Sequence, residues 1–291
     1  MVIDGADEAL AATAAEIPAT VVVLKHRSGP ATARNQGART AICDILLFID
    51  ADVEVPADLA ARVARLFNDH PHLSAVMGSY DDAPGDVGFV SQYRNLLHHF
   101  VHQTAREEAT TFWAGCGAVR RKAFHEVGGF DARWVDPSIE DIEFGSRLVR
   151  AGHSIRLAKD LQVKHLKRWT VTDMLATDLW RRAVPWTELM LGAVQIVNDL
   201  NVKTRDRFSV ALALVALVAL LLAWRSPILA GTALLAAILL VVLNARLFRF
   251  FVKQRGVLFA AGAVPLYWLY LLICGLGFAL GVARHLTRER R

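Results

Sequence analysis

Short apolar runs alternate with helical patterns over residues 1–160. The runs are rich in Val, Ile and Leu, which is typical of β-strands, and helical repeats fill the intervals between them. Alternation of this kind predicts a mostly parallel sheet with helices on its faces. We therefore expect an α/β domain with strands at Val21–Leu24, Ile45–Ile49 and Leu73–Met77, and helices at Glu8–Ala15, Ala31–Thr40 and Ala57–Asn68.

Beyond residue 207 the pattern changes to long runs without a charged residue. Three such runs, each of at least 17 residues, follow one another. About 20 apolar residues cross the hydrocarbon core of a bilayer. Pro265 and nearby glycines leave a bend or a re-entrant path open for the last run. We expect three membrane helices, at 208–224, 227–245 and 257–282.

The charges are distributed unevenly along the 291 residues. Residues 201–291 hold 12 of the 33 Lys and Arg but 2 of the 28 Asp and Glu, a balance of +10; the first 200 hold the other 21 and 26, a balance of −5. The basic surplus lies between and after the apolar runs, so it indicates the flanks of a membrane region rather than a nucleic-acid surface. The positive-inside rule places two basic groups on the cytoplasmic side: Lys203, Arg205 and Arg207, and Arg246, Arg249, Lys253 and Arg255.

The C-terminal arginines leave the number of spans open. A third full crossing would export Arg284, Arg288, Arg290 and Arg291 against the same rule. We favour three spans and keep two as the alternative. The expected location is the cell (inner or plasma) membrane, with a multi-pass anchor and a cytoplasmic α/β domain.

The segment 180–200 mixes Trp, Pro, Leu and Val side chains with Arg181, Arg182 and Glu188. An amphipathic helix in the membrane interface has this composition, and a soluble helix packed on the domain has it too. The expected organisation is a domain over 1–178, a connector over 179–206 and a membrane region over 207–291.

The cysteine content excludes two kinds of framework. Cys43, Cys116 and Cys274 are too few and too scattered for a disulfide scaffold or a zinc site. They fit a reducing compartment.

Two aspartates follow the apolar run Ile45–Ile49 directly. Strand side chains alternate with period two, so Asp50 and Asp52 are expected to point the same way at the carboxyl end of the strand, where open α/β sheets bind ligands. Paired carboxylates there suit a hard divalent cation that is shared with phosphates. The alternative is a polar turn with both acids solvated.

Ser138-Ile-Glu-Asp141 opens a helical stretch that ends at Gly152. As a structural motif, Ser-x-x-Asp resembles a capping box, and acids favour helix N-termini. As a functional motif, Asp141 is a carboxylate able to accept a proton from an attacking hydroxyl.

His165 follows the short apolar run Leu161–Val163. An imidazole is a reasonable third ligand for a manganese-like ion already held by carboxylates. Isolated histidines are more often packed or solvated, and that alternative stays open.

The run Gly29–Gly37 begins a helix with small residues on one face. Such a helix either brings its backbone close to a ligand, with Arg34 meeting a base or phosphate, or packs closely on a sheet. Asp4, at the end of the first apolar dipeptide, is placed like an acid that binds a ribose or base edge.

Small residues follow Trp113 in the run Trp113-Ala-Gly-Cys-Gly. Together with the turn Gly128-Gly-Phe-Asp131, this loop suits the border of a sugar pocket with Trp113 as a stacking wall. Ordinary turn chemistry is the alternative.

In this order the motifs resemble the family 2 glycosyltransferases of the GT-A fold, over roughly residues 1–170. The resemblance is more specific than any single motif because order and spacing both hold. The matching runs are Val2-Ile-Asp-Gly, Ala33-Arg-Asn-Gln-Gly, Phe48-Ile-Asp-Ala-Asp, Gly115-Cys-Gly-Ala-Val-Arg-Arg-Lys-Ala-Phe, Gly128-Gly-Phe-Asp131, Glu140-Asp141-Ile-Glu-Phe-Gly-Ser-Arg-Leu-Val-Arg-Ala-Gly152 and the Val-x-His that ends at His165.

The resemblance implies a nucleotide-diphosphate sugar donor and a Mg²⁺ or Mn²⁺ ion bound by Asp52, with His165 assisting. Asp141 would be the base in an inverting displacement, and the metal would offset charge on the leaving diphosphate. Membrane-bound members commonly use lipid-linked or polysaccharide acceptors, so the implied partners are the donor, a lipid or glycan acceptor and the membrane.

The resemblance also implies contacts with the substrates. These are Asp4 and Arg34 to the nucleoside, Asp50 to the ribose or the metal shell, and Trp113, Gly115, Glu140 and Arg181 to the sugar, acceptor or diphosphate.

Two departures from the family pattern matter. Processive synthases have Gln-x-x-Arg-Trp after the base, whereas this chain has Leu179-Trp-Arg-Arg-Ala-Val-Pro-Trp186, which argues against polymer synthesis. The family normally begins with a strand and helix that would precede Val2. We therefore expect an N-terminally truncated GT-A-like sheet, with Met1 not the biological start.

Two rival functions remain. A nucleotidyltransferase shares a similar sheet and metal acids, but Glu140-Asp141 and Gly128-Gly-Phe-Asp131 argue against it. A truncated, non-catalytic membrane protein of the same fold is the other; retention of Asp52, Asp141 and His165 argues against it.

Overall fold

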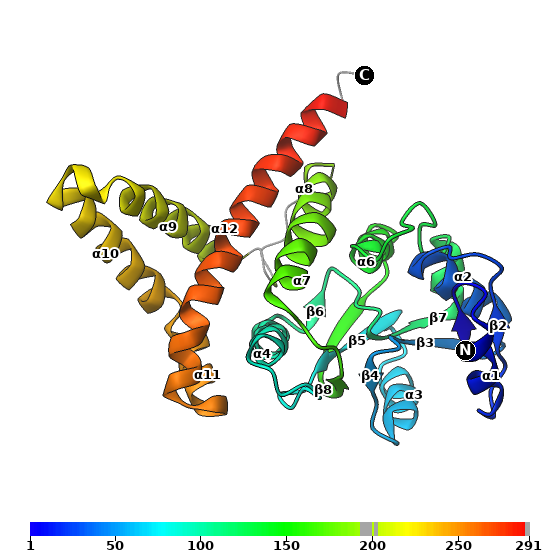
Figure 1. The fold of residues 1–291 in the computed structure, drawn as a ribbon. Helices are drawn as coiled ribbons and strands as arrows, with labels where there is room; N and C mark the ends of the chain where they lie inside the picture. Colours follow the sequence, from blue (N-terminus) through cyan, green and yellow to red (C-terminus); the bar gives the residue numbers. More distant parts are fainter. Residues whose placement is uncertain (193–199, 201–202, 289–291) are drawn as a thin grey trace. The chain divides into compact units, whose positions relative to one another are not determined.

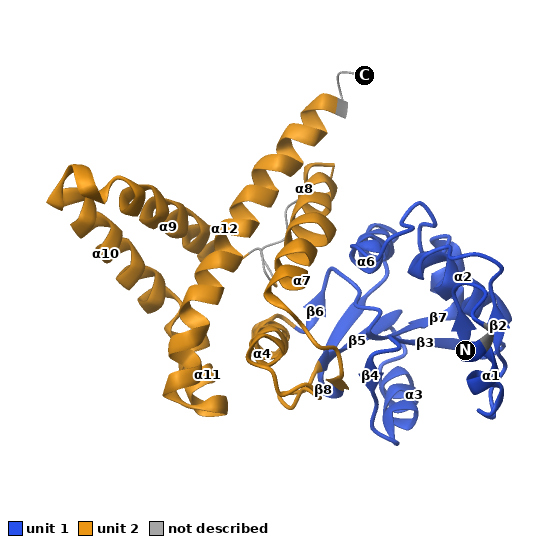
Figure 2. Cartoon of the chain, viewed as in Figure 1, with its two compact units in different colours: residues 1–79, 107–163 blue, residues 80–106, 164–291 orange. Residues whose placement is uncertain are grey.

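The computed structural model describes residues 1–192, 200 and 203–288, in two compact units (Figure 2). Unit 1 comprises Met1–Ser79 and Glu107–Val163, and unit 2 comprises Tyr80–Arg106 and Lys164–Arg291. The division differs from the expected boundary at 178, because 80–106 and 164–178 group with the C-terminal helices. Of the connector expected at 179–206, residues 193–199 and 201–202 lie outside the described residues.

Unit 1 alternates strands and helices as the sequence predicts (Figure 1). Its elements are β1 (Val2–Ile3), α1 (Glu8–Ala15), β2 (Val22–Val23), α2 (Pro30–Thr40), β3 (Ile45–Ile49), β4 (Val53–Glu54), α3 (Leu59–Asp69), β5 (Ala75–Tyr80), β6 (Glu108–Ala109), β7 (Cys116–Arg120), α5 (Arg121–Glu126), α6 (Glu140–Arg150) and β8 (Ile155–His165). The strands β5 and β8 each end in residues that are assigned to unit 2.

The expected element bounds are close to the observed ones. The helix α1 and the strand β3 have the expected limits, and α2 begins one residue early at Pro30, a residue whose fixed φ suits the first turn of a helix. The helix α3 begins at Leu59 rather than at residue 57, and β5 continues three residues beyond the expected Met77.

Two sheets build the unit. The larger has the strand order β3-β7-β5-β8-β4, with β6 paired to β8, and the smaller is the parallel pair β1-β2. The strand β7 runs antiparallel to both β3 and β5, so β3 and β5 share one direction with a reversed strand between them. The strand β3 ends the larger sheet, which places the residues after Ile49 at its margin.

Five buried phenylalanines form the aromatic centre of unit 1. The Phe48 ring on β3 lies 5.2 Å from the Phe130 ring and 5.7 Å from the Phe124 ring, centroid to centroid. Phe144 on α6 lies 4.6 Å from Phe130, and Phe112 completes the group. This cluster joins β3, α6 and the turn around Phe130, so it fixes the end of β3, which Asp50 follows, and the start of α6, where Glu140 and Asp141 lie.

Unit 2 is helical. Its elements are α4 (Phe89–Thr104), α7 (Val171–Ala176), the π-helix η1 (Thr177–Ala183), α8 (Val184–Leu191), α9 (Thr204–Leu221), the short 3₁₀ helix η3 (Ala223–Arg225), α10 (Pro227–Leu243), α11 (Ala245–Arg255) and α12 (Val257–Arg288) (Figure 1).

Among the described helices, one is by itself long and apolar enough to cross a membrane. It covers 31 residues, Val257–Thr287, at a mean hydropathy of 2.1. The 17-residue α10 qualifies only together with α11, from which it is bent by 67°. The helix α9 starts at Thr204, so three charged residues occupy its first turns. The expected first and second spans, 208–224 and 227–245, therefore stay predictions.

Candidate active site

Arg34 on α2 joins two acids that are distant in sequence. Its Nη2 donates to Asp50 Oδ1 at 2.8 Å and its Nη1 donates to Glu140 Oε1 at 2.7 Å. The guanidinium also lies 5.5 Å from the centre of the Phe130 ring. The structure thus brings together three of the residues predicted to line the site. Because both terminal nitrogens of Arg34 already have partners, its expected contact with the nucleoside stays a prediction.

Asp141 lies in the first turn of α6, where the helix dipole favours acids. Its Oδ2 accepts a hydrogen bond from the Ala114 N–H at 3.1 Å, and its Oδ1 accepts one from the Ile142 N–H at 2.8 Å. The N-cap position of α6 is Ile139, one residue after the Ser138 of the expected capping box, and the Ile139 side chain makes no capping bond. The Ser138 N–H instead donates to Glu140 Oε2.

The surroundings of Asp141 favour its protonated form. Burial and the adjacent Glu140 carboxylate raise the pKa of Asp141 to about 7, against the opposing effects of Arg34 and the Ala114 N–H. A carboxyl group that titrates near neutral pH can accept and release a proton under physiological conditions. This is the property required of a general base.

Asp50 and Asp52 lie beyond the end of β3 rather than on it. The strand stops at Ile49, and Asp52 sits in the turn before β4. The period-two argument for a shared direction therefore does not apply to this pair. The Asp50 N–H donates to the Gly115 carbonyl at 3.2 Å, which fixes the start of the turn against the loop before β7.

The indole of Trp113 packs over Gly115. A Cβ at Gly115 would lie 2.4 Å from Trp113 Cζ2, so this position requires glycine. The loop that holds this pair also supplies the carbonyl bonded to Asp50 and the N–H bonded to Asp141. The glycine at position 115 therefore has a steric reason, and the loop contacts both Asp50 and Asp141. Its expected place at the border of a sugar pocket stays a prediction.

Asp4 has a structural role in this unit. Its two carboxylate oxygens accept hydrogen bonds from the Ser28 and Gly29 N–H groups at 2.7 and 2.8 Å. These bonds tie β1 to the start of α2. A nucleoside contact from Asp4 stays a prediction.

His165 and Arg181, the remaining predicted site residues, belong to unit 2. The His165 ring is buried and stacks on Tyr80, with ring centroids 4.2 Å apart and planes inclined by 15°. Its carbonyl accepts the Gly85 N–H at 2.8 Å. Arg181 lies exposed on η1. Their predicted metal and diphosphate contacts stay predictions.

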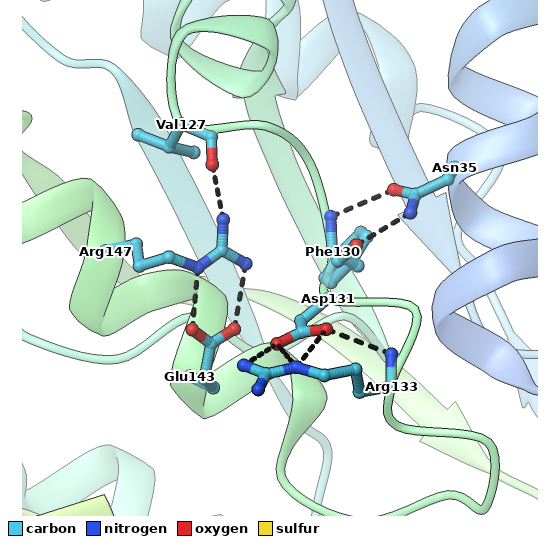
Figure 3. Close-up of polar contacts among 7 residues, drawn as sticks. All are labelled: Asn35, Val127, Phe130, Asp131, Arg133, Glu143 and Arg147. Atoms are coloured by element: carbon cyan, nitrogen blue, oxygen red, sulfur yellow. Dashed lines mark hydrogen bonds and ion pairs between the residues drawn. The ribbon is translucent and has the colours of Figure 1, made fainter.

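Sequence reasoning assigned no role to Asn35, which ties α2 to the turn around Phe130. Its amide donates to the Phe130 carbonyl at 2.7 Å and accepts the Phe130 N–H at 2.9 Å (Figure 3). Nearby, Arg147 on α6 bonds both oxygens of Glu143 and the Val127 carbonyl. Asn35 lies inside a run that carries the family resemblance, and that was the available signal.

Within the described ranges, no three His, Cys, Asp or Glu side chains are grouped as a ready-made metal site. The carboxylates of Asp50 and Asp52 nevertheless suit a hard cation that takes most of its ligands from phosphate and water, as Mg²⁺ does. The residues present fit an ion that binds together with its substrate.

The whole fold aligns with that of a solved glycosyltransferase, mannosyltransferase PcManGT from Pyrobaculum calidifontis in complex with GDP-Man and Mn²⁺. The alignment covers 96% of this chain and 76% of the other, with a TM-score of 0.55 and 17% identity. It confirms a GT-A-like α/β fold followed by a helical region. The molecule therefore has a fold of the GT-A class, with acids after β3 and at the start of α6.

Sequence comparison is more specific about the N-terminal part. Residues 1–128 match the family Glycosyl transferase family 2. Pre-mycofactocin glycosyltransferases of two Mycobacterium tuberculosis strains, CDC 1551 and H37Rv, are each 28% identical over 158 residues, which is 52% of this chain and 33% of the relative. The match spans one third of the length of these curated relatives.

Proposed function

We propose that this protein is a membrane-bound, metal-dependent, inverting glycosyltransferase that moves a sugar from a nucleotide-diphosphate sugar to an acceptor hydroxyl. Asp141 carries the proposal. It is held by two backbone N–H groups at the start of α6, and its pKa of about 7 suits proton transfer.

In the proposed reaction Asp141 takes the proton of the acceptor hydroxyl while that oxygen attacks the anomeric carbon of the donor sugar. The new carbon–oxygen bond forms as the bond to the diphosphate breaks, and the nucleoside diphosphate leaves with the electron pair. Asp52 would hold a bound Mg²⁺ or Mn²⁺, which stabilises the negative charge on that leaving group. The loop of Trp113 and Gly115 would border the sugar.

The substrates and the membrane are proposed on two observations. The mannosyltransferase with the same fold was solved with GDP-Man and Mn²⁺, which supports a nucleotide-sugar donor and a divalent ion. The helix Val257–Thr287 supports membrane attachment. Attachment near a bilayer favours a lipid or lipid-linked acceptor, with α9, α10 and α11 as further membrane elements and the catalytic domain on the cytoplasmic side.

A donor panel tests the proposal. Full-length protein in membranes is incubated with labelled nucleotide sugars and Mn²⁺, and release of nucleoside diphosphate is measured. Asp141→Asn should lower turnover of the active donor by about 10² or more, because an amide cannot accept the proton.

The matched control is Asp44→Asn, the same chemical change at a side chain that is 98% exposed. It should retain wild-type turnover. Unchanged turnover in Asp141→Asn, or release of pyrophosphate in place of nucleoside diphosphate, would contradict the proposal.

A further inference from the structure

Arg34 is a cation placed among three acids. Its two terminal nitrogens form ion pairs with Asp50 and Glu140, and 17% of its side chain is exposed. Burial opposes its charge, but Asp50, Glu140 and Asp141 more than compensate, so the pKa of Arg34 lies above its usual value. Arg34 is therefore charged under all ordinary conditions.

The position of Arg34 is fixed by its helix. At the start of α2, Gly29 has a φ of +87° and approaches Val135 so closely that a Cβ would lie 2.0 Å from the Val135 carbonyl oxygen. Directly after Arg34, Asn35 makes its two hydrogen bonds to the Phe130 backbone (Figure 3). These contacts tie α2 at two points to the segment between α5 and α6.

Asp141 faces charged groups from three parts of unit 1. Glu140 precedes it on α6, and Arg34 on α2 and Asp50 after β3 act on it electrostatically; the Ala114 N–H donates to it from the loop before β7. The two carboxylates favour protonated Asp141, whereas Arg34 favours the carboxylate. A general base must start as the carboxylate.

We propose that Arg34 is a positioning residue for the base: its guanidinium clamps Asp50 and Glu140 together and so makes the neighbouring Asp141 easier to ionise. This rests on the proposed function in assigning the base to Asp141. The clamp predicts that two substitutions change the ionisation of Asp141 in opposite directions. Removal of the Arg34 charge should make Asp141 harder to ionise, and removal of the Glu140 charge should make it easier.

The test follows the carboxyl group itself rather than turnover. Infrared difference spectra of the full-length protein, without donor or metal, are titrated across neutral pH. The carbonyl band of protonated Asp141 is assigned by its loss in Asp141→Asn. In the wild type the midpoint should lie near the pKa of about 7.

Arg34→Gln should raise that midpoint by about 1 unit and Glu140→Gln should lower it by about 1 unit, which is the range for removal of a neighbouring charge. Arg34→Lys keeps the charge and should stay closer to the wild type than Arg34→Gln. Arg39→Gln is the matched control, because it removes the same charge from the same helix at an exposed side chain; it should leave the midpoint unchanged.

Shifts of the same sign in Arg34→Gln and Glu140→Gln, no shift in either, or an equal shift in Arg39→Gln would overturn the proposal. If Arg34→Gln fails to melt cooperatively, Arg34→Lys and Glu140→Gln decide. The outcome is separable from that of the proposed function: a chain inert toward every donor would contradict the transferase, while the titration would still report on the clamp.

Discussion

The charge state of Asp141 is set by several neighbours at once. Burial and Glu140 raise the pKa of Asp141 in the folded protein, while Arg34 and hydrogen bonds from backbone N–H groups favour its ionised form. When it is ionised, a carboxyl group in this balance lowers the stability of the folded state, as is common at sites that need a perturbed carboxyl group.

This balance gives stability a pH dependence with a definite sign. The folded pKa of Asp141 lies above its unfolded value of 3.8, so the folded state holds the proton more tightly. The stability contribution is fully present below the unfolded value and is lost as the pH rises toward about 7. Asp141→Asn mimics the protonated state at every pH. At a pH above 7, the free energy of unfolding of this variant should exceed that of the wild type by roughly 1–2 kcal/mol, a value reduced for solvent screening.

Chemical denaturation of both proteins at acidic and at slightly alkaline pH measures this difference. Near the unfolded pKa the two should coincide. A constant difference at both values would mean that the substitution acts through packing rather than through the proton.

Some roles of single residues could be anticipated and others could not. The place of Asp141 in the first turn of a helix could be anticipated, because a helix start is local information. The partners of Arg34 were not, since Glu140 is 106 positions away and no pattern in α2 encodes it. The engagement of Asp4 by the Ser28 and Gly29 N–H groups also depends on how a loop returns to β1.

At the scale of elements, the site depends on how closely α6 lies on the chain before β7. Gly145 makes this possible, because a Cβ there would lie 2.2 Å from the Phe112 backbone nitrogen. The helix cannot move away without displacing Asp141, which shares its first turn with Glu140.

Gly145→Ala should therefore lower the free energy of unfolding by about 1–3 kcal/mol, the usual effect of overpacking, although alanine is the better helix former. Ser146→Ala on the same helix, at a half-buried position, is the control and should change stability little. Denaturant unfolding of both variants measures the effect. A Gly145→Ala variant as stable as the wild type would mean that α6 is free to shift.

The bounds of β3 and α1 were predictable because the ends of a continuous apolar run and of a short helical repeat are visible in the local sequence. The reversed direction of β7 was not, since strand direction is decided by long-range pairing with β3 and β5. The run 208–224 also looked like a span by composition, but α9 begins at Thr204 and so includes charges that the run excluded.

At the scale of the whole molecule, α12 is the element that should decide membrane attachment. Leu276, near its middle, is 47% exposed, and Leu286, near its end, is 52% exposed. Arginine in the centre of a spanning helix costs about 2.5–3.5 kcal/mol, whereas an arginine near the end extends to the interface.

Leu276→Arg should therefore increase the fraction of protein released from membranes by alkaline carbonate, and Leu286→Arg should not. Immunoblots of pellet and supernatant measure this fraction. Equal release of both variants, or release of the wild type, would show that α12 does not span.

The division into units has a consequence for biosynthesis. The chain passes between the units three times, after residues 79, 106 and 163 (Figure 2). A ribosome synthesises α4 long before the rest of unit 2. Unit 1 remains incomplete until β8 has been synthesised. Domains generally fold as units during synthesis, but here neither unit can finish before the other has begun. No single proteolytic cut or gene truncation would therefore deliver either unit whole.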